Sequence, residues 1–172
     1  MAPTTHPTAP QAADPATDPA TDPATDLAGD AAAGPAGAEL YTEILALYAR
    51  QAWQLDGSDA EAFVATFTES ASFAHVSSNE VLVGRQAIAE ALHRTAERRR
   101  GAVHRHWFSQ LRVERVDADT VNTWYYAIVS ATDATGAVTW DPSCVVEDVL
   151  VRSEGRWLTS SRVVRRDDLL LR

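Results

Sequence analysis

Residues 103–131, VHRHWFSQLRVERVDADTVNTWYYAIVSA, decide how this chain is expected to fold. Two runs rich in β-branched and aromatic residues, 103–116 and 120–131, flank a short Asp-Ala-Asp turn, which is the pattern of two antiparallel strands. Two further β-rich runs follow at 138–152 and 156–166, and turn residues separate each run from the next. The C-terminal part is therefore expected to contain four long antiparallel strands.

The segment before these strands has the pattern of three helices. Apolar residues in 39–55 recur at spacings of three and four, as on one face of a helix, and Gly57 is expected to end that helix. A second helix is predicted to start at Ser58, with Glu61 completing a capping box. The remaining elements are a short strand and a third helix, at 71–75 and 84–99. This order predicts an α+β fold, a cone-shaped barrel in which three N-terminal helices pack on a curved, mainly antiparallel sheet.

The first 38 residues differ in composition from the rest of the 172-residue chain. They are almost entirely Ala, Pro, Thr, Asp and Gly, with an Asp-Pro-Ala-Thr repeat that starts at 14, 18 and 22. Such a segment buries too little apolar surface to offset the entropy of ordering it, so we expect 1–38 to be a disordered tail and 39–172 to be one domain. The tail lacks both the apolar core of a secretory signal and the arginines of a transit peptide.

Charge and composition narrow the classes of function. Five of the nine net negative charges lie in the tail, which leaves −4 on residues 39–172, so no nucleic-acid partner is expected. The basic cluster formed by Arg94 and Arg98–Arg100 lies at a predicted helix end, where cations favour the helix dipole. No run of ~18 apolar residues occurs, so no membrane association is expected. The absence of lysine excludes a lysine Schiff base, and the single cysteine favours a cytoplasmic location.

Several short motifs, in their order along the chain, resemble those of a known family. They are Leu55-Asp56-Gly57-Ser58-Asp59, Phe63, Phe67-Thr68, Ala71-Ser72-Phe73, Gly84-Arg85-Gln86-Ala87-Ile88, His106 with Arg112–Val116, Glu147–Arg152, and Gly155-Arg156-Trp157 with Arg162. Over 39–172 the chain resembles the SnoaL-like, scytalone dehydratase-like branch of the nuclear transport factor 2-like superfamily. That superfamily includes dehydratases, steroid isomerases, polyketide cyclases and non-catalytic proteins. The resemblance therefore implies the fold, and the function depends on the site.

The resemblance to scytalone dehydratase also implies roles for single residues. Asp56 falls at the Asp of that family's first helix, His106 at its catalytic His, and His75 at a pocket Tyr. Arg162 falls at a pocket-lining position, whereas the second catalytic His is replaced by Ala131, which argues against the same substrate.

Residue chemistry agrees with these roles. Imidazole exchanges a proton near neutral pH, and a carboxylate on its other nitrogen fixes the tautomer. We therefore expect His106 to move the proton and Asp56 to orient it. His75 is expected to polarise a substrate oxygen, and Arg162 to hold a carboxylate, enolate or phenolate.

Each assignment has a structural alternative. Asp56 could only accept backbone N–H groups of its own turn, and His75 could be a half-exposed strand residue. Arg162 could form an ion pair across the last hairpin with Asp148 or Glu147.

A metal site is a weaker alternative. His104 and His106 share one strand face, and His75 could lie nearby, but no further ligand stands at a characteristic spacing. We expect neither a metal nor a cofactor.

Strand alternation predicts which side chains line the pocket. Tyr125 is expected to supply a hydroxyl group there. The other expected lining residues are Trp53, Phe73, Ala127, Val129, Cys144 and Val146. On the opposite face, Trp124, Tyr126 and Trp140 are expected to point outward and to suit contact within a homodimer.

The leading interpretation is a cofactor-independent enzyme of secondary metabolism. It would be a dehydratase, isomerase or cyclase that acts by acid–base catalysis on a small polyketide-like or polycyclic substrate. The alternatives are a non-catalytic subunit, like the small subunits of ring-hydroxylating dioxygenases, and a ligand-binding or protein-binding module.

Overall fold

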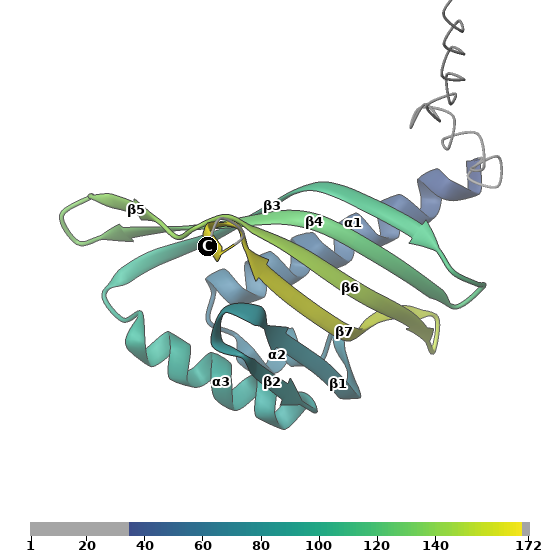
Figure 1. The fold of residues 1–172 in the computed structure, drawn as a ribbon, viewed down its shortest axis with the longest axis horizontal. Helices are drawn as coiled ribbons and strands as arrows, with labels where there is room; N and C mark the ends of the chain where they lie inside the picture. The colour runs from purple at the N-terminus through teal and green to yellow at the C-terminus, as the bar shows by residue number, and fades with distance from the viewer. Residues whose placement is uncertain (1–34, 170–172) are drawn as a thin grey trace, which may run out of the picture. The chain divides into compact units, whose positions relative to one another are not determined.

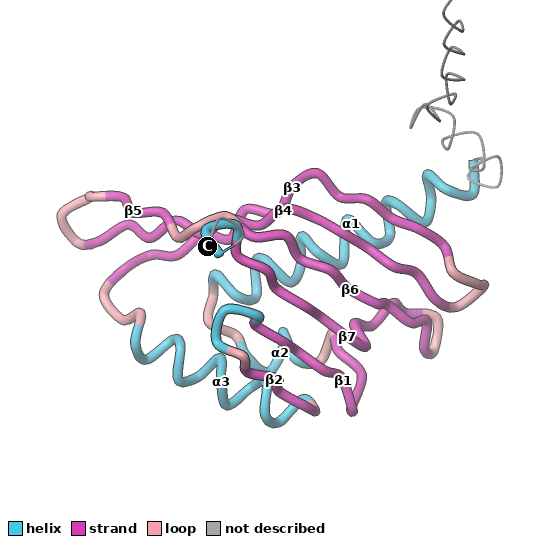
Figure 2. Tube along the Cα trace, viewed as in Figure 1, coloured by secondary structure: helices cyan, strands magenta, loops and turns pink. Residues whose placement is uncertain are grey.

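A computed structural model describes residues 35–169 of the chain. Residues 1–34 of the predicted disordered tail lie outside the described residues. The first helix, α1, spans Pro35–Asp56 and so begins four residues before the predicted start. Together, the described residues form three α-helices, α1 included, that pack on one sheet (Figures 1 and 2).

The sheet has seven strands: β1 Phe67–His75, β2 Glu80–Val83, β3 Ala102–Arg115, β4 Thr120–Asp133, β5 Val138–Trp140, β6 Cys144–Ser153 and β7 Arg156–Arg166. Their order is β2-β1-β7-β6-β4-β3, with β5 paired to β4. The β1–β7 pair is parallel and all other pairs are antiparallel. The predicted α+β fold with a mainly antiparallel sheet is confirmed, but the sheet is not a closed barrel. Its end strands, β2 and β3, do not pair with each other among the described residues.

Helix α1 packs on the inner face of the long strands, and it crosses behind β3 and β4 in Figure 1. Apolar side chains at three- and four-residue spacings, such as Ile44, Leu47 and Tyr48, meet buried residues of β4 and β6, such as Tyr125 and Leu150. Helix α1 contacts β3, and the hydrogen bond that the His106 N–H donates to Asp56 places the C-terminal end of α1 beside the first half of β3.

A second, smaller core joins α2 Ala60–Val64 and α3 Arg85–Arg98 to β1. Its centre consists of Phe63, Phe67 and Ile88, each at most 1% exposed. In Figure 1 these helices lie beside the short strands β1 and β2, so the domain has one core under the long strands and another under the short ones. Within the described residues, no helix is both long enough and apolar enough to cross a membrane.

The strands differ from the prediction in three places. Strand β1 begins at Phe67 rather than at 71, and β2 was not predicted. The run 138–152 is two strands, because the chain leaves the sheet at Asp141–Ser143, where Pro142 has no N–H group to donate.

The predicted N-cap of the second helix is also wrong. Ser58 has a φ of 56°, and the N-cap is Asp59, whose carboxylate accepts the N–H of Ala62 at 3.0 Å. The cap therefore lies one residue later than the capping-box pattern predicts.

Candidate functional site

The last residue of α1 meets the first half of β3 through a direct hydrogen bond. Asp56 Oδ1 lies 2.9 Å from Nδ1 of His106 and also accepts the backbone N–H of His106 at 2.8 Å. The two side chains are 13% and 16% exposed. The alternative that Asp56 serves its own turn is wrong, since the N–H groups of Gly57 and Ser58 bond to the carbonyl groups of Trp53 and Leu55.

This geometry determines which nitrogen of His106 is available. A carboxylate accepts and does not donate, so Nδ1 carries the hydrogen and Nε2 of the neutral ring keeps a free lone pair. Burial lowers the pKa of His106, the hydrogen bond and charge of Asp56 raise it, and the net effect of all influences is a lowering. Electrostatic interactions with Arg99 and His104 lower the pKa of His106 further. His106 is therefore a neutral base at neutral pH.

The pair lines a cavity of about 460 Å³ between the ends of α1 and α3 and the start of β3. Gln54 and Asp56 line it from α1, Arg99 and Arg100 from the end of α3, and His106 from β3. On the other side, Asp56 and His106 also line a groove of about 330 Å³ between α1 and β3. His106 thus lines both the cavity and the groove.

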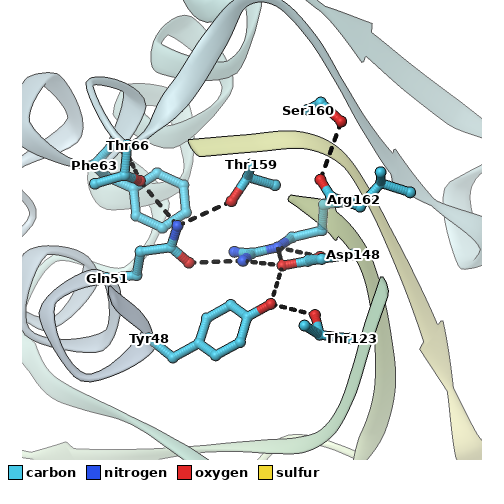
Figure 3. A network of polar contacts seen from close by, with 10 residues as sticks. Tyr48, Gln51, Phe63, Thr66, Thr123, Asp148, Thr159, Ser160 and Arg162 are labelled. Carbon is cyan, nitrogen blue, oxygen red and sulfur yellow. Dashed lines mark hydrogen bonds and ion pairs between the residues drawn. The ribbon is translucent and has the colours of Figure 1, made fainter. Parts of the chain in front are cut away.

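Arg162 lies in the core and does not line this cavity. Its Nε and Nη2 bond to the carboxylate of Asp148 at 2.9 and 2.6 Å, and Nη2 also bonds to Gln51 Oε1 at 2.6 Å (Figure 3). Arg162 is 2% exposed and Asp148 is 3% exposed. Burial lowers the pKa of Arg162, but the charge and hydrogen bonds of Asp148, together with Tyr125 and Tyr48, produce a net rise. Of the two alternatives from the sequence, the geometry matches the structural ion pair with Asp148.

The pair belongs to a larger polar network. Tyr48 donates to Asp148 at 3.0 Å and bonds to Thr123, while Gln51 Nε2 donates to Thr66 and Thr159 at 2.9 and 3.2 Å (Figure 3). Five aromatic rings, those of Tyr48, Phe63, Phe67, Phe73 and Tyr125, surround the guanidinium at 5.2–5.9 Å. The network joins α1 to β4, β6 and β7.

Comparison with known proteins identifies the family. The profile of the SnoaL-like domain matches residues 36–163. The chain belongs to the SnoaL-like family. No curated protein matches this SnoaL-like chain.

Solved structures agree with the family assignment. Aln2 from a Streptomyces species is 44% identical, with a TM-score of 0.72, over 80% of this chain and 96% of that one. ActVI-ORFA from Streptomyces coelicolor is 34% identical, with a TM-score of 0.71, over 76% and 98%. A protein from Catenulispora acidiphila, solved in complex with S-DNPA, is 35% identical, with a TM-score of 0.71, over 78% and 98%. The predicted resemblance to the SnoaL-like proteins is confirmed.

Of the other predicted site residues of this SnoaL-like protein, Val129 pairs with His106 across strands β4 and β3, but neither it nor the others line the cavity of the Asp56–His106 pair. His75 is exposed at the end of β1 and does not line the cavity of His106. Trp53 was predicted to line the pocket, but it is 78% exposed and lines the groove between α1 and β3 instead of the cavity. Within residues 35–169, no three His, Cys, Asp or Glu side chains lie close enough to hold one metal ion.

Strand alternation predicted correctly which face of β4 points into the core. Tyr125 and Ala127 are buried, and the ring of Tyr125 lies 4.5 Å from that of Tyr48 and 4.9 Å from that of Phe108. Val146 is also in the core, and Phe73, Val129 and Cys144 are partly buried. Burial raises the pKa of the Cys144 thiol, so this group is a poor nucleophile. Contact of these residues with a substrate stays a prediction.

Sequence reasoning missed three polar residues that the structure makes prominent. Gln51 lies fully buried within the apolar stripe of α1, and its position between Tyr48 and Leu55 was the available signal. Gln54 and Arg99 line the cavity, and no local pattern distinguishes them from other polar residues at helix ends.

Proposed function

We propose that this SnoaL-like protein is a cofactor-independent enzyme in which His106 acts as a general base and Asp56 orients it. The observation that carries the proposal is the 2.9 Å contact between Asp56 Oδ1 and His106 Nδ1 at the wall of the cavity. A neutral imidazole fixed by a carboxylate can remove a proton from a substrate and return it in a later step.

The proposed reaction begins with proton removal. Nε2 of His106 takes a proton from a carbon next to a carbonyl group, which leaves an enolate and an imidazolium that Asp56 stabilises. In a dehydration, the enolate re-forms the carbonyl while the β-hydroxyl leaves with the proton of His106 as water. In an isomerisation, the enolate is conjugated with a double bond and takes the proton back from His106 at a different carbon. In a cyclisation, the enolate carbon attacks a second carbonyl group, and the alkoxide that forms takes the proton from His106.

A polyketide-like or polycyclic substrate fits this site best. A cavity of about 460 Å³ is within the usual size range of small-molecule sites. Members of the superfamily that this chain resembles include polyketide cyclases, and a relative that is 35% identical was solved in complex with S-DNPA. These points support a role in secondary metabolism. A cytoplasmic location stays a prediction.

Hydrogen exchange tests the base without knowledge of the natural substrate. The bicyclic ketone 2-tetralone is incubated with the protein in D₂O, and deuterium at the carbon next to its carbonyl group is followed by NMR. We expect catalysed exchange that falls about 10²–10⁴-fold in His106→Ala. His93→Ala is the matched control, because His93 is exposed and paired with Glu61.

Exchange no faster than in buffer, or exchange unchanged by His106→Ala, would contradict the proposal. The binding-module alternative predicts that a ligand binds without any exchange, and so does the non-catalytic subunit. The same measurement therefore separates the enzyme from both alternatives.

A further inference from the structure

Gln54 has a buried acceptor without a partner. Gln54 is one of the residues that line the cavity of Asp56 and His106. Within residues 35–169, Gln54 Oε1 is the only buried side-chain oxygen or nitrogen that has no hydrogen-bond partner. A buried acceptor left unpaired destabilises the fold, so its presence beside a candidate site requires an explanation.

The fold itself does not use this amide. The carbonyl group of Gln54 accepts the N–H of Asp59 at 2.9 Å, so backbone atoms complete the end of α1. Gln51, nearly one turn earlier, uses both ends of its amide in the buried network. The contrast shows that neighbouring residues can provide hydrogen-bond partners for both ends of a buried glutamine amide in this region.

Several donors around the cavity already have partners within the protein. Arg99 bonds to Asp141 at 3.0 Å, Arg100 to Glu97 at 2.6 Å, and Arg105 to the carbonyl group of His104 at 2.8 Å. The hydroxyl of Thr95 donates to Ala91 within α3. None of these four groups donates to Gln54 in these bonds, and a bound molecule can supply the missing donor.

We propose that Gln54 orients the substrate by accepting a hydrogen bond from one of its hydroxyl groups. The amide torsion of a glutamine is soft, and no hydrogen bond holds this one, so Oε1 can turn toward a ligand in the cavity. This inference rests on the proposed function, and it specifies a hydroxylated polycyclic substrate bound against His106. A ligand without the hydroxyl leaves the acceptor unpaired and binds more weakly.

Binding of two bicyclic probes tests the inference. We would titrate the wild-type protein, Gln54→Met and Gln54→Leu with 1-naphthol and with 1-methoxynaphthalene, which cannot donate. The wild type is expected to bind 1-naphthol about 10-fold more tightly than the ether, and both variants are expected to lose this preference. Gln86→Met, at an exposed glutamine paired with Glu90, should keep it.

A stability measurement separates this role from a structural one. Because Gln54 makes no side-chain hydrogen bond within the described chain, Gln54→Leu should not lower the midpoint of urea unfolding. Equal affinity of the wild type for the two probes, no saturable binding of 1-naphthol, or a preference retained in Gln54→Met would overturn the inference. The titrations need no turnover, so failed exchange with an intact hydroxyl preference would contradict only the proposed function.

Discussion

The His106 imidazole is subject to opposing influences. Burial, Arg99 and His104 lower its pKa from the ordinary value of 6.5, and Asp56 raises it, with a net lowering. Since the neutral ring is the base, the exchange rate should be constant at neutral pH and should fall as the pH drops through a midpoint below 6.5. Rates of 2-tetralone exchange between about pH 5 and pH 8 would show this, whereas a midpoint above neutrality would contradict it.

Neighbouring charges should move this midpoint in opposite directions. Arg99→Gln removes a cation that disfavours the imidazolium, so the pKa of His106 should rise. Asp56→Asn removes the partner that favours the imidazolium, so the pKa should fall. NMR titration of the imidazole signals measures both shifts. Arg156→Gln, at a 70% exposed side chain at the start of β7, should leave the pKa unchanged, and equal shifts in all three variants would argue against specific coupling.

At the scale of elements, local patterns predicted most helices and strands, and they failed where two neighbouring residues have similar propensities. Ser58 and Asp59 are both good N-caps, and only the backbone conformation distinguishes them. Strand β2 is short and lies at the edge of the sheet, so its four residues give little periodic signal. The break before β6 had a signal in Pro142, which the apolar character of the flanking residues obscured.

The cap of α2 gives a matched pair of substitutions. Asp59→Ala removes the acceptor for the N–H of Ala62 and should lower the free energy of unfolding by about 0.5–2 kcal/mol. Ser58→Ala removes no described cap and should have a much smaller effect. Urea denaturation of the two variants measures the difference. A larger loss in Ser58→Ala would restore the capping box predicted from the sequence.

The buried ion pair connects β6 to β7 and α1. Asp148→Ala would leave the Arg162 guanidinium buried without its carboxylate, so we expect a loss of about 3–5 kcal/mol in the free energy of unfolding. Glu147→Ala is the control, because Glu147 pairs with Arg165 in a solvent-exposed contact. The double variant Asp148→Leu/Arg162→Met should lose less than Asp148→Ala. A loss in Asp148→Ala no larger than in the control would contradict this account.

At the scale of the whole molecule, the sequence predicted the layers better than the long-range contacts. The order of helices and strands was sufficient to predict an α+β fold with a mainly antiparallel sheet. The parallel pairing of β1 with β7 joins residues about 90 positions apart, and no local pattern specifies it. For the same reason, the sequence left open whether Arg162 meets a ligand or a carboxylate. The contact of Asp56 with His106 could be expected only because the family resemblance implies both residues.

Three exposed aromatic residues share the outer face of the sheet. Trp107, Tyr126 and Trp140 are 54%, 56% and 56% exposed. Cross-strand pairing places Trp107 opposite Ile128 and Trp140 opposite Ser130, so with Tyr126 they share the face opposite to that of Tyr125. Trp107 also donates to Ser130 at 3.2 Å, and its ring lies 6.5 Å from that of Trp140. Aromatic residues gathered in this way are typical of protein interfaces.

We therefore expect the protein to form a homodimer through this face. A charge at the centre of an apolar interface is costly when it is buried, so Tyr126→Arg and Trp140→Arg should shift the protein toward monomer without changing its circular dichroism. Sedimentation velocity measures the distribution. Val81→Arg, at a 62% exposed residue of β2 at the far edge of the sheet, should remain dimeric. A monomeric wild type would refute the homodimer, and a dimer that resists both arginine variants would move the interface to another face. The site lies between α1, α3 and β3, so a monomeric variant that retains 2-tetralone exchange would show that each subunit carries a complete site.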